Sequence, residues 1–213
     1  MKVAIFSESS ADEAAIRILV EGVLGTQTEM PSSMPPIRSR GWGAVLRDLP
    51  MVLRHLHYQT DADALVVVLD SDRSPVHRPA GCESAKPVKK CRLCQMAAIL
   101  TQAQNTLPSR PSYGSLKTAL GLAVPQIEAW YLAGRAPHVS EAAWIVGLQS
   151  GKFPYTPDSL KEELYGTNEP LLELETARAE QEARRIVREE KLGLLEQLFP
   201  GGFGALAADV RSW

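Results

Sequence analysis

Short apolar runs alternate with amphipathic segments over the first 135 residues of the chain. The run from Ala64 to Leu69 is wholly apolar and rich in valine, which predicts a strand buried on both faces of a parallel sheet. Residues 2–6 and 115–124 predict two further strands. Helical spacing of apolar residues follows in three segments: 11–20, with Ser9 or Ser10 as its N-cap, 42–59, despite Pro50, and 91–107.

This alternation of strands and helices predicts right-handed βαβ crossovers and therefore an α/β fold with a parallel sheet. We expect about four strands flanked by helices, with the fourth in the polar stretch 26–40, near Glu29 or Ile37. Residues 1–135 would form the α/β domain, which includes a Cys-rich loop at 73–94. Residues 136–213 would form an α-helical C-terminal extension.

The C-terminal extension differs from the rest of the chain in its pattern. Residues 169–190 carry alternating acids and bases with a thin apolar stripe, which is typical of a solvated helix packed on one side. The segment 194–213 is richer in large apolar residues. We expect it to pack back on the domain or against another subunit, so a homo-oligomer through the C-terminal helices is one expectation.

Charge and hydropathy indicate where in the cell the protein is expected, but they do not identify a binding partner. The 213 residues include 23 basic and 25 acidic side chains, for a formal net charge of −2. Bulk charge therefore predicts no partner, although a local basic patch could bind nucleic acid. No apolar segment approaches the length of a membrane span and no signal peptide is recognisable, so we expect a cytoplasmic protein without membrane contact.

Acidic residues follow the ends of two predicted strands. Asp70 and Asp72 come directly after the valine-rich strand, and Glu8 follows the first strand. Residues two apart on a strand face the same way, so both aspartates would project from its carboxyl end, where α/β sheets bind ligands. Converging carboxylates favour a hard divalent cation such as Mg²⁺ or Mn²⁺. The alternative to a cation site is that the strand simply ends in a polar turn, in which aspartate and serine are common. For Asp12 and Glu13 we favour a structural interpretation, in which these acids in the first turn of a helix complement its dipole.

The three cysteines lie close together in the sequence. With His77, the residues Cys82, Cys91 and Cys94 supply three sulfurs and one imidazole, which is a donor set that suits structural Zn²⁺. The loop that holds them is rich in proline and glycine and has little core of its own, so a metal would stabilise it. Alternatively, Cys91 and Cys94 are small apolar residues of a helix.

A strand ending in glutamate, a helix, and a later strand ending in Asp-x-Asp resemble the Toprim domain of topoisomerases, primases and overcoming-lysogenization-defect nucleases. The segment from Leu122 to Trp130 also resembles the AVPxxExW stretch of a bacterial Toprim-like family, domain of unknown function 4276. That resemblance adds Glu128 to the acids. It implies a Mg²⁺-dependent nuclease, possible action in phage defence, and an ABC-type ATPase partner. In one respect the chain departs from many such nucleases, because Ser9 rather than glycine follows Glu8.

In a nuclease of this kind, Asp70 and Asp72 would be metal ligands and Glu8 a ligand or general base. Lys117 would neutralise the phosphate in the transition state, or else is a solvated residue at a strand end. Basic side chains near the expected crevice could follow a nucleic-acid backbone: Arg38, Arg40, Arg73, Arg78, Lys86, Lys89 and Lys90.

Two other functions compete with the nuclease. The stretch from Leu69 to Ser74 resembles the opening motif of haloacid-dehalogenase-type phosphatases, which would make the protein an aspartate-based phosphatase. That motif normally ends the first strand, however, and here a strand and helix precede it. The other possibility is a catalytically inactive Toprim-like binding module that docks on an ATPase partner.

Overall fold

Three parallel strands form the centre of the molecule. The computed structural model describes residues 1–35, 41–77, 82, 91–108 and 115–213. The strands are β1 (Val3–Phe6), β2 (Ala64–Asp70) and β3 (Lys117–Ala123), in the order β1-β2-β3. The central strand β2 is buried from Ala64 to Leu69 because it has a neighbour on each edge and helices on both faces. The predicted parallel α/β sheet is confirmed.

A fourth strand is not found in the part of the chain that the structure describes. Glu29 makes one isolated parallel bridge with Lys2, so the polar stretch approaches the edge of β1 without continuing as a strand. The other expected position, Ile37, lies outside the described residues. The sheet therefore has three strands where about four were expected.

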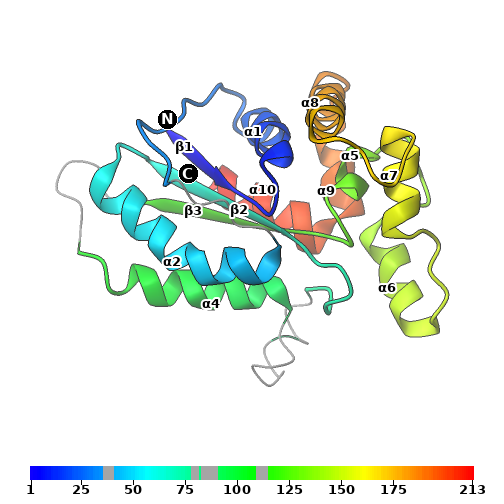
Figure 1. Ribbon diagram of the computed structural model, residues 1–213, viewed down its shortest axis with the longest axis horizontal. Coiled ribbons are helices and arrows are strands. Elements are labelled where there is room, and N and C mark those ends of the chain that lie inside the picture. Colours follow the sequence, from blue (N-terminus) through cyan, green and yellow to red (C-terminus); the bar gives the residue numbers. More distant parts are fainter. Residues whose placement is uncertain (36–40, 78–81, 83–90, 109–114) are drawn as a thin grey trace.

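Helices cover both faces of the sheet (Figure 1). Helices α2 (Trp42–Gln59) and α4 (Arg92–Gln104) pack together on one face, and α1 (Ser10–Leu24) lies on the other with α10 (Ala205–Arg211). Ser9 caps α1 by accepting a hydrogen bond from the backbone N–H of Ala11. The apolar spacing predicted α1, α2 and α4 close to their observed bounds, although α1 continues to Leu24.

The remaining helices come from the C-terminal part of the chain: α5 (Glu128–Tyr131), α6 (Glu141–Ser150), α7 (Pro157–Tyr165), α8 (Leu172–Arg188), α9 (Leu192–Leu198) and a π-helical turn at Pro200–Gly204. Figure 1 shows α5, α6 and α7 grouped beyond the carboxyl ends of the strands, whereas α8 lies along α1. No helix within the described ranges combines the length and the apolar character needed to cross a bilayer.

The C-terminal segment packs back on the sheet, as one of the two expectations had it. Helix α10 contacts β3, and the Phe203 ring meets Trp130 edge to face at 5.3 Å between ring centres. Helix α8 is tied to the core by Glu182, a buried carboxylate that pairs with Arg135 and Arg185. These contacts make the C-terminal helices part of the structure that holds the carboxyl edge of the sheet.

Candidate functional site: an acidic cluster beside a His/Cys group

The loop after β2 is attached to the chain that follows β3. The backbone N–H of Ser71 donates to the Ala123 carbonyl at 2.7 Å, and that of Asp72 donates to the Pro125 carbonyl at 2.8 Å. Strand β2 ends at Asp70, and Asp72 lies in a turn with a φ of 46°. The expectation that both aspartates project from one strand face is therefore wrong, because the chain turns between them.

Glu8 and Asp70 lie side by side at the carboxyl edge of the sheet. Glu8 Oε1 accepts a hydrogen bond of 3.0 Å from the backbone N–H of Asp70. Asp70 Oδ1 in turn accepts one of 3.0 Å from the backbone N–H of Ile127. Residues from the end of β1, the end of β2 and the segment after β3 thus meet at one place, as parallel strand ends require.

Two more carboxylates face the same region. Glu128 begins α5, is buried, and has its Oε1 4.0 Å from Lys161 Nζ on α7. Asp12 of α1 accepts a hydrogen bond of 3.1 Å from the Tyr131 hydroxyl. Asp12 was interpreted from sequence as a helix-dipole acid, and the structure gives it a further role as a neighbour of Glu128. We call Glu8, Asp12, Asp70, Asp72 and Glu128 the acidic cluster.

Burial and mutual repulsion raise the pKa values of four carboxyl groups of the acidic cluster. Burial raises the pKa of Asp70 well above its usual range, and the negative charges of Glu128, Glu8, Asp12 and Asp72 raise it further. Burial and the charge of Glu128 raise the pKa of Asp12 to about 8. Burial also raises the pKa values of Glu8 and Glu128. The fold therefore holds these carboxyl groups together against their electrostatic preference.

Arg92 is one residue of this site that sequence reasoning missed. Its Nη1 donates to the Asp70 carbonyl at 2.5 Å and to Asp72 Oδ2 at 2.8 Å. The guanidinium also lies 4.6 Å from the ring centre of Trp42, within cation–π range. A signal existed in the sequence, because an arginine in the first turn of a helix opposes the helix dipole and calls for a tertiary partner.

Lys117 does not belong to the acidic cluster. It is the first residue of β3 and pairs with Ala64, whereas Asp70 pairs with Ala123 at the other end of the same two strands. Its Nζ donates instead to the backbone oxygen of Trp213 at 2.6 Å. The expected catalytic role of Lys117 is therefore wrong, because a lysine at the start of a strand lies at the opposite edge of the sheet. Among the described residues, the basic side chain that pairs with Glu128 is Lys161.

The donor chemistry of the acidic cluster fits a divalent cation only in part. Among the described residues, no three of its carboxylate oxygens form a compact ligand group; the His/Cys group is the one such set present. Mg²⁺ is commonly bound by only one or two carboxylates and completes its shell with water and phosphate oxygens. Asp70 Oδ2 and Asp72 Oδ1 accept no hydrogen bond from the described residues.

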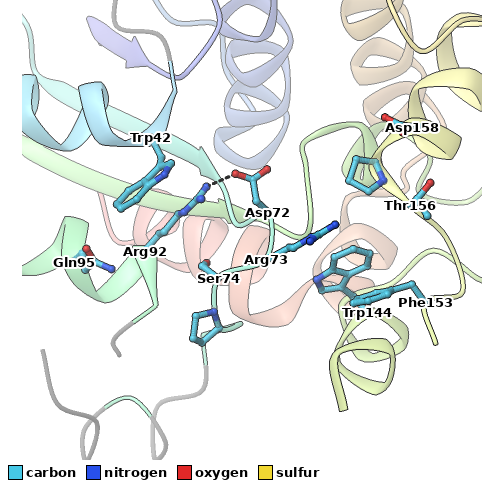
Figure 2. A pocket seen from close by; sticks show the side chains of 12 residues that line it. Trp42, Asp72, Arg73, Ser74, Arg92, Gln95, Trp144, Phe153, Thr156 and Asp158 are labelled. Carbon is cyan, nitrogen blue, oxygen red and sulfur yellow. Dashed lines mark hydrogen bonds and ion pairs between the residues drawn. The ribbon is translucent and has the colours of Figure 1, made fainter. Parts of the chain in front are cut away.

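A pocket of about 760 Å³ opens beside Asp72 (Figure 2). One wall is the loop after β2, which contributes Arg73 and Ser74, together with the first residues of α2 and α4, Trp42 and Arg92. The opposite wall comes from α6, the start of α7 and the segment between these helices: Trp144, Phe153, Thr156, Pro157 and Asp158. The pocket thus lies between the α/β part of the chain and its C-terminal helices.

Of the basic residues expected near the crevice, Arg73 lines this pocket and is exposed. The others lie outside the described residues: Arg38, Arg40, Arg78, Lys86, Lys89 and Lys90.

The four residues expected to bind zinc come together in the structure. The ligand atoms of His77, Cys82, Cys91 and Cys94 all lie within 4.8 Å of one another. His77 Nδ1 is 3.4 Å from the sulfurs of both Cys91 and Cys94, and the Cys82 and Cys91 sulfurs are 3.5 Å apart. Tetrahedral zinc, with Zn–S bonds of about 2.3 Å and Zn–N of about 2.0 Å, spaces its ligand atoms about 3.5 to 3.8 Å apart.

The protonation of this group also suits a metal. Burial lowers the pKa of His77, which keeps its imidazole neutral and able to bind a metal. Burial raises the pKa of the Cys91 thiol to about 12, so without a cation this sulfur keeps its proton. Cys91 also caps α4, whose first residue is Arg92. A metal held here would therefore fix the helix end that holds Asp72.

No protein-family model matches this chain, and neither the curated proteins nor the solved structures include a match to it. Its class is therefore defined by its own fold and sites. It is an α/β protein with a three-stranded parallel sheet, an acidic cluster at the carboxyl edge of that sheet, and a His/Cys group that could hold a structural metal such as zinc. The resemblance to Toprim domains stays a prediction.

Proposed function

We propose that this protein is a Mg²⁺-dependent phosphodiester hydrolase that cleaves nucleic acid at the acidic cluster. The observation that supports this most is the gathering of five carboxyl groups at the carboxyl edge of a parallel sheet, where burial, and then the charges of the other four, raise the pKa of Asp70. Keeping such a cluster costs stability, and residues that cost stability are commonly kept for function. The arrangement favours a positively charged ligand.

Each residue of the site has a separate role in the proposed reaction. Asp70 and Asp72 would hold the cation through the carboxylate oxygens that accept no hydrogen bond from the described residues. A Mg²⁺ ion held there would supply charge stabilisation at the phosphate and would lower the pKa of a water that it binds. Glu8 serves as general base, because burial raises its pKa towards neutrality. Arg92 positions Asp72, and Lys161 limits the negative charge at Glu128.

The test is cleavage of labelled single-stranded and duplex DNA and RNA with and without Mg²⁺ or Mn²⁺. Asp70→Asn preserves the acceptor oxygen for the Ile127 N–H but removes the negative charge. We expect it to lower Mg²⁺-dependent cleavage by about 100-fold or more, with folding intact by circular dichroism. Glu163→Gln, on the exposed surface of α7, is the matched control and should cleave like the wild type.

The outcomes separate the competing functions. Absence of cleavage by the wild type with either cation on all four substrates would refute the nuclease and favour a binding module. Hydrolysis of a phosphate monoester such as p-nitrophenyl phosphate, lost in Asp70→Asn while no diester is cleaved, would instead support the aspartate-based phosphatase.

For the His/Cys group we propose Zn²⁺ as the resident metal, in a structural role. Three thiols and one imidazole at tetrahedral spacing are typical of structural zinc, which leaves no open coordination position for substrate. The four ligands come from the segment after β2 and from the start of α4. Zinc would therefore hold the loop of Asp72 and the helix of Arg92 in a fixed relation.

A further inference from the structure

The pocket beside Asp72 carries features that the acidic cluster does not explain. We propose that it binds one unpaired nucleotide of the substrate strand, next to the phosphodiester that the acidic cluster would cleave. This inference rests on the proposed function for the identity of the strand, whereas the binding itself can be measured without cleavage. Its support comes from the rings, the polar atoms and the charges that line the pocket.

Aromatic rings with exposed surface stand on opposite walls of the pocket (Figure 2). Phe153 is 40% exposed and packs on Trp144 at 4.5 Å between ring centres, and Trp42 is 38% exposed on the other side. Exposed aromatic side chains facing a cavity are the usual platforms for stacking of unpaired bases. The volume of about 760 Å³ lies within the range of pockets that take a small-molecule ligand, so a nucleotide is of suitable size.

Two residues that line this pocket, Ser74 and Trp144, each carry a buried polar atom without a partner among the described residues. The Trp144 side chain is 3% exposed and its Nε1 makes no hydrogen bond, and Ser74 Oγ is likewise buried without a partner within the described residues. A buried indole N–H normally finds an acceptor. The ring nitrogens and carbonyl oxygens of a base provide such acceptors, and the Ser74 hydroxyl can either donate or accept. A base could therefore satisfy both groups once the side chains that cover them shift, whereas a purely apolar ligand could not.

The charges place the phosphate of the nucleotide near the acidic cluster. Helices α2, α4 and α7 all begin at the pocket, so the positive ends of three helix dipoles surround it. Arg92 is neutralised by Asp72, whereas the Arg73 guanidinium makes no ion pair within the described residues and extends towards the side of Trp144 in Figure 2. Asp158, in the first turn of α7, also lines the pocket and repels a phosphate on that side. The charges therefore favour a phosphate beside Arg73 and the loop that carries Asp70 and Asp72.

A paired base enters this pocket at a higher cost than an unpaired one, because it must first leave its stack and break its pairing in the duplex. The proposal therefore predicts a preference for single strands, and it can be tested without any cleavage. The probe is a single-stranded oligonucleotide containing the fluorescent base 2-aminopurine, whose emission falls when it stacks on an aromatic ring. Titrations use the full protein with no added divalent cation and no chelator, so that a metal in the His/Cys group stays in place.

We expect wild-type protein to quench the probe and to bind the single strand more tightly than the matching duplex. Phe153→Ala should lose the quenching and raise the Kd about 5- to 100-fold, the usual loss for one stacked base. Tyr58→Ala, which removes an exposed ring at the far end of α2, is the matched control and should bind like the wild type. Arg73→Ala should lower the slope of log K against log salt by about 0.7, and Arg54→Ala, an exposed arginine of α2, should not.

The results separate this inference from the proposed function. Quenching that depends on Phe153, in a protein that cleaves nothing, supports the nucleotide pocket and refutes only the nuclease. Mg²⁺-dependent cleavage without quenching, and with Phe153→Ala binding like the wild type, overturns the pocket and leaves the nuclease standing. A free nucleoside 5′-monophosphate that binds as tightly as the strand would also overturn the proposal, because the pocket would then serve a small molecule.

Discussion

Substitution of Asp12 by asparagine tests whether the acidic cluster is held together at a cost in stability. Burial and the charge of Glu128 raise the pKa of Asp12 to about 8 from a usual value of 3.8. An acid with a raised pKa in the folded state stays protonated there while the unfolded chain releases its proton. It therefore lowers the free energy of unfolding increasingly as the pH rises from about 4 to about 8.

The magnitude follows from the two pKa values. At pH 7, which is below the raised pKa, the cost depends on the distance of the pH from the usual pKa of 3.8. At about 1.4 kcal/mol per pH unit, Asp12 lowers the free energy of unfolding at pH 7 by about 4 kcal/mol. Relaxation of the site and entry of water reduce this cost, so we expect Asp12→Asn to stabilise the protein by about 1 to 4 kcal/mol at pH 7. Asparagine retains an acceptor oxygen for the Tyr131 hydroxyl, so the substitution keeps this hydrogen bond.

The assay is urea unfolding of the wild type and Asp12→Asn at pH 5, 7 and 8, without divalent cations. The stabilisation should grow steadily with pH, and a control variant with an exposed acid replaced, Glu163→Gln, should show no such growth. A stabilisation that is absent, or equal at pH 5 and pH 8, would refute the reasoning, because it would mean that Asp12 is ionised at little cost in the folded protein.

Two further predictions concern the metal group and the packing of the C-terminal segment. Purified protein should contain about one zinc per chain by elemental analysis. The variant His77→Ala should lose this zinc and unfold at a lower temperature, whereas His138→Ala, at an exposed position, should keep both the zinc and the unfolding temperature of the wild type. Wild-type protein that contains no metal would contradict the prediction. Gly202→Ala should destabilise by about 2 to 4 kcal/mol in urea unfolding, because its Cβ would lie 2.1 Å from the Leu122 carbonyl oxygen of β3. Gly193→Ala, on open helix surface, should instead stabilise by about 0.5 to 1 kcal/mol, and equal effects would refute the close approach.

The hydrophobic pattern alone predicted most of the secondary structure. The central strand from Ala64 and the helix from Trp42 to Gln59 begin where their patterns begin, because burial on two faces and burial on one stripe leave distinct periods in the sequence. The grouping of His77 with the three cysteines was also predictable, since short spacing along the chain limits how far apart the four residues can lie.

Only the tertiary structure decided which residues share the site. Asp12, Arg92 and Lys161 lie on three different helices, and nothing in their local sequence fixes their distance from Asp70 or Glu128. The same holds for the separation of Lys117 from the acids, which depends on the direction and register of β3. Local periodicity records which face of an element is buried, but the identity of the neighbour across that face is set by how the elements pack, and that information is spread over the whole chain.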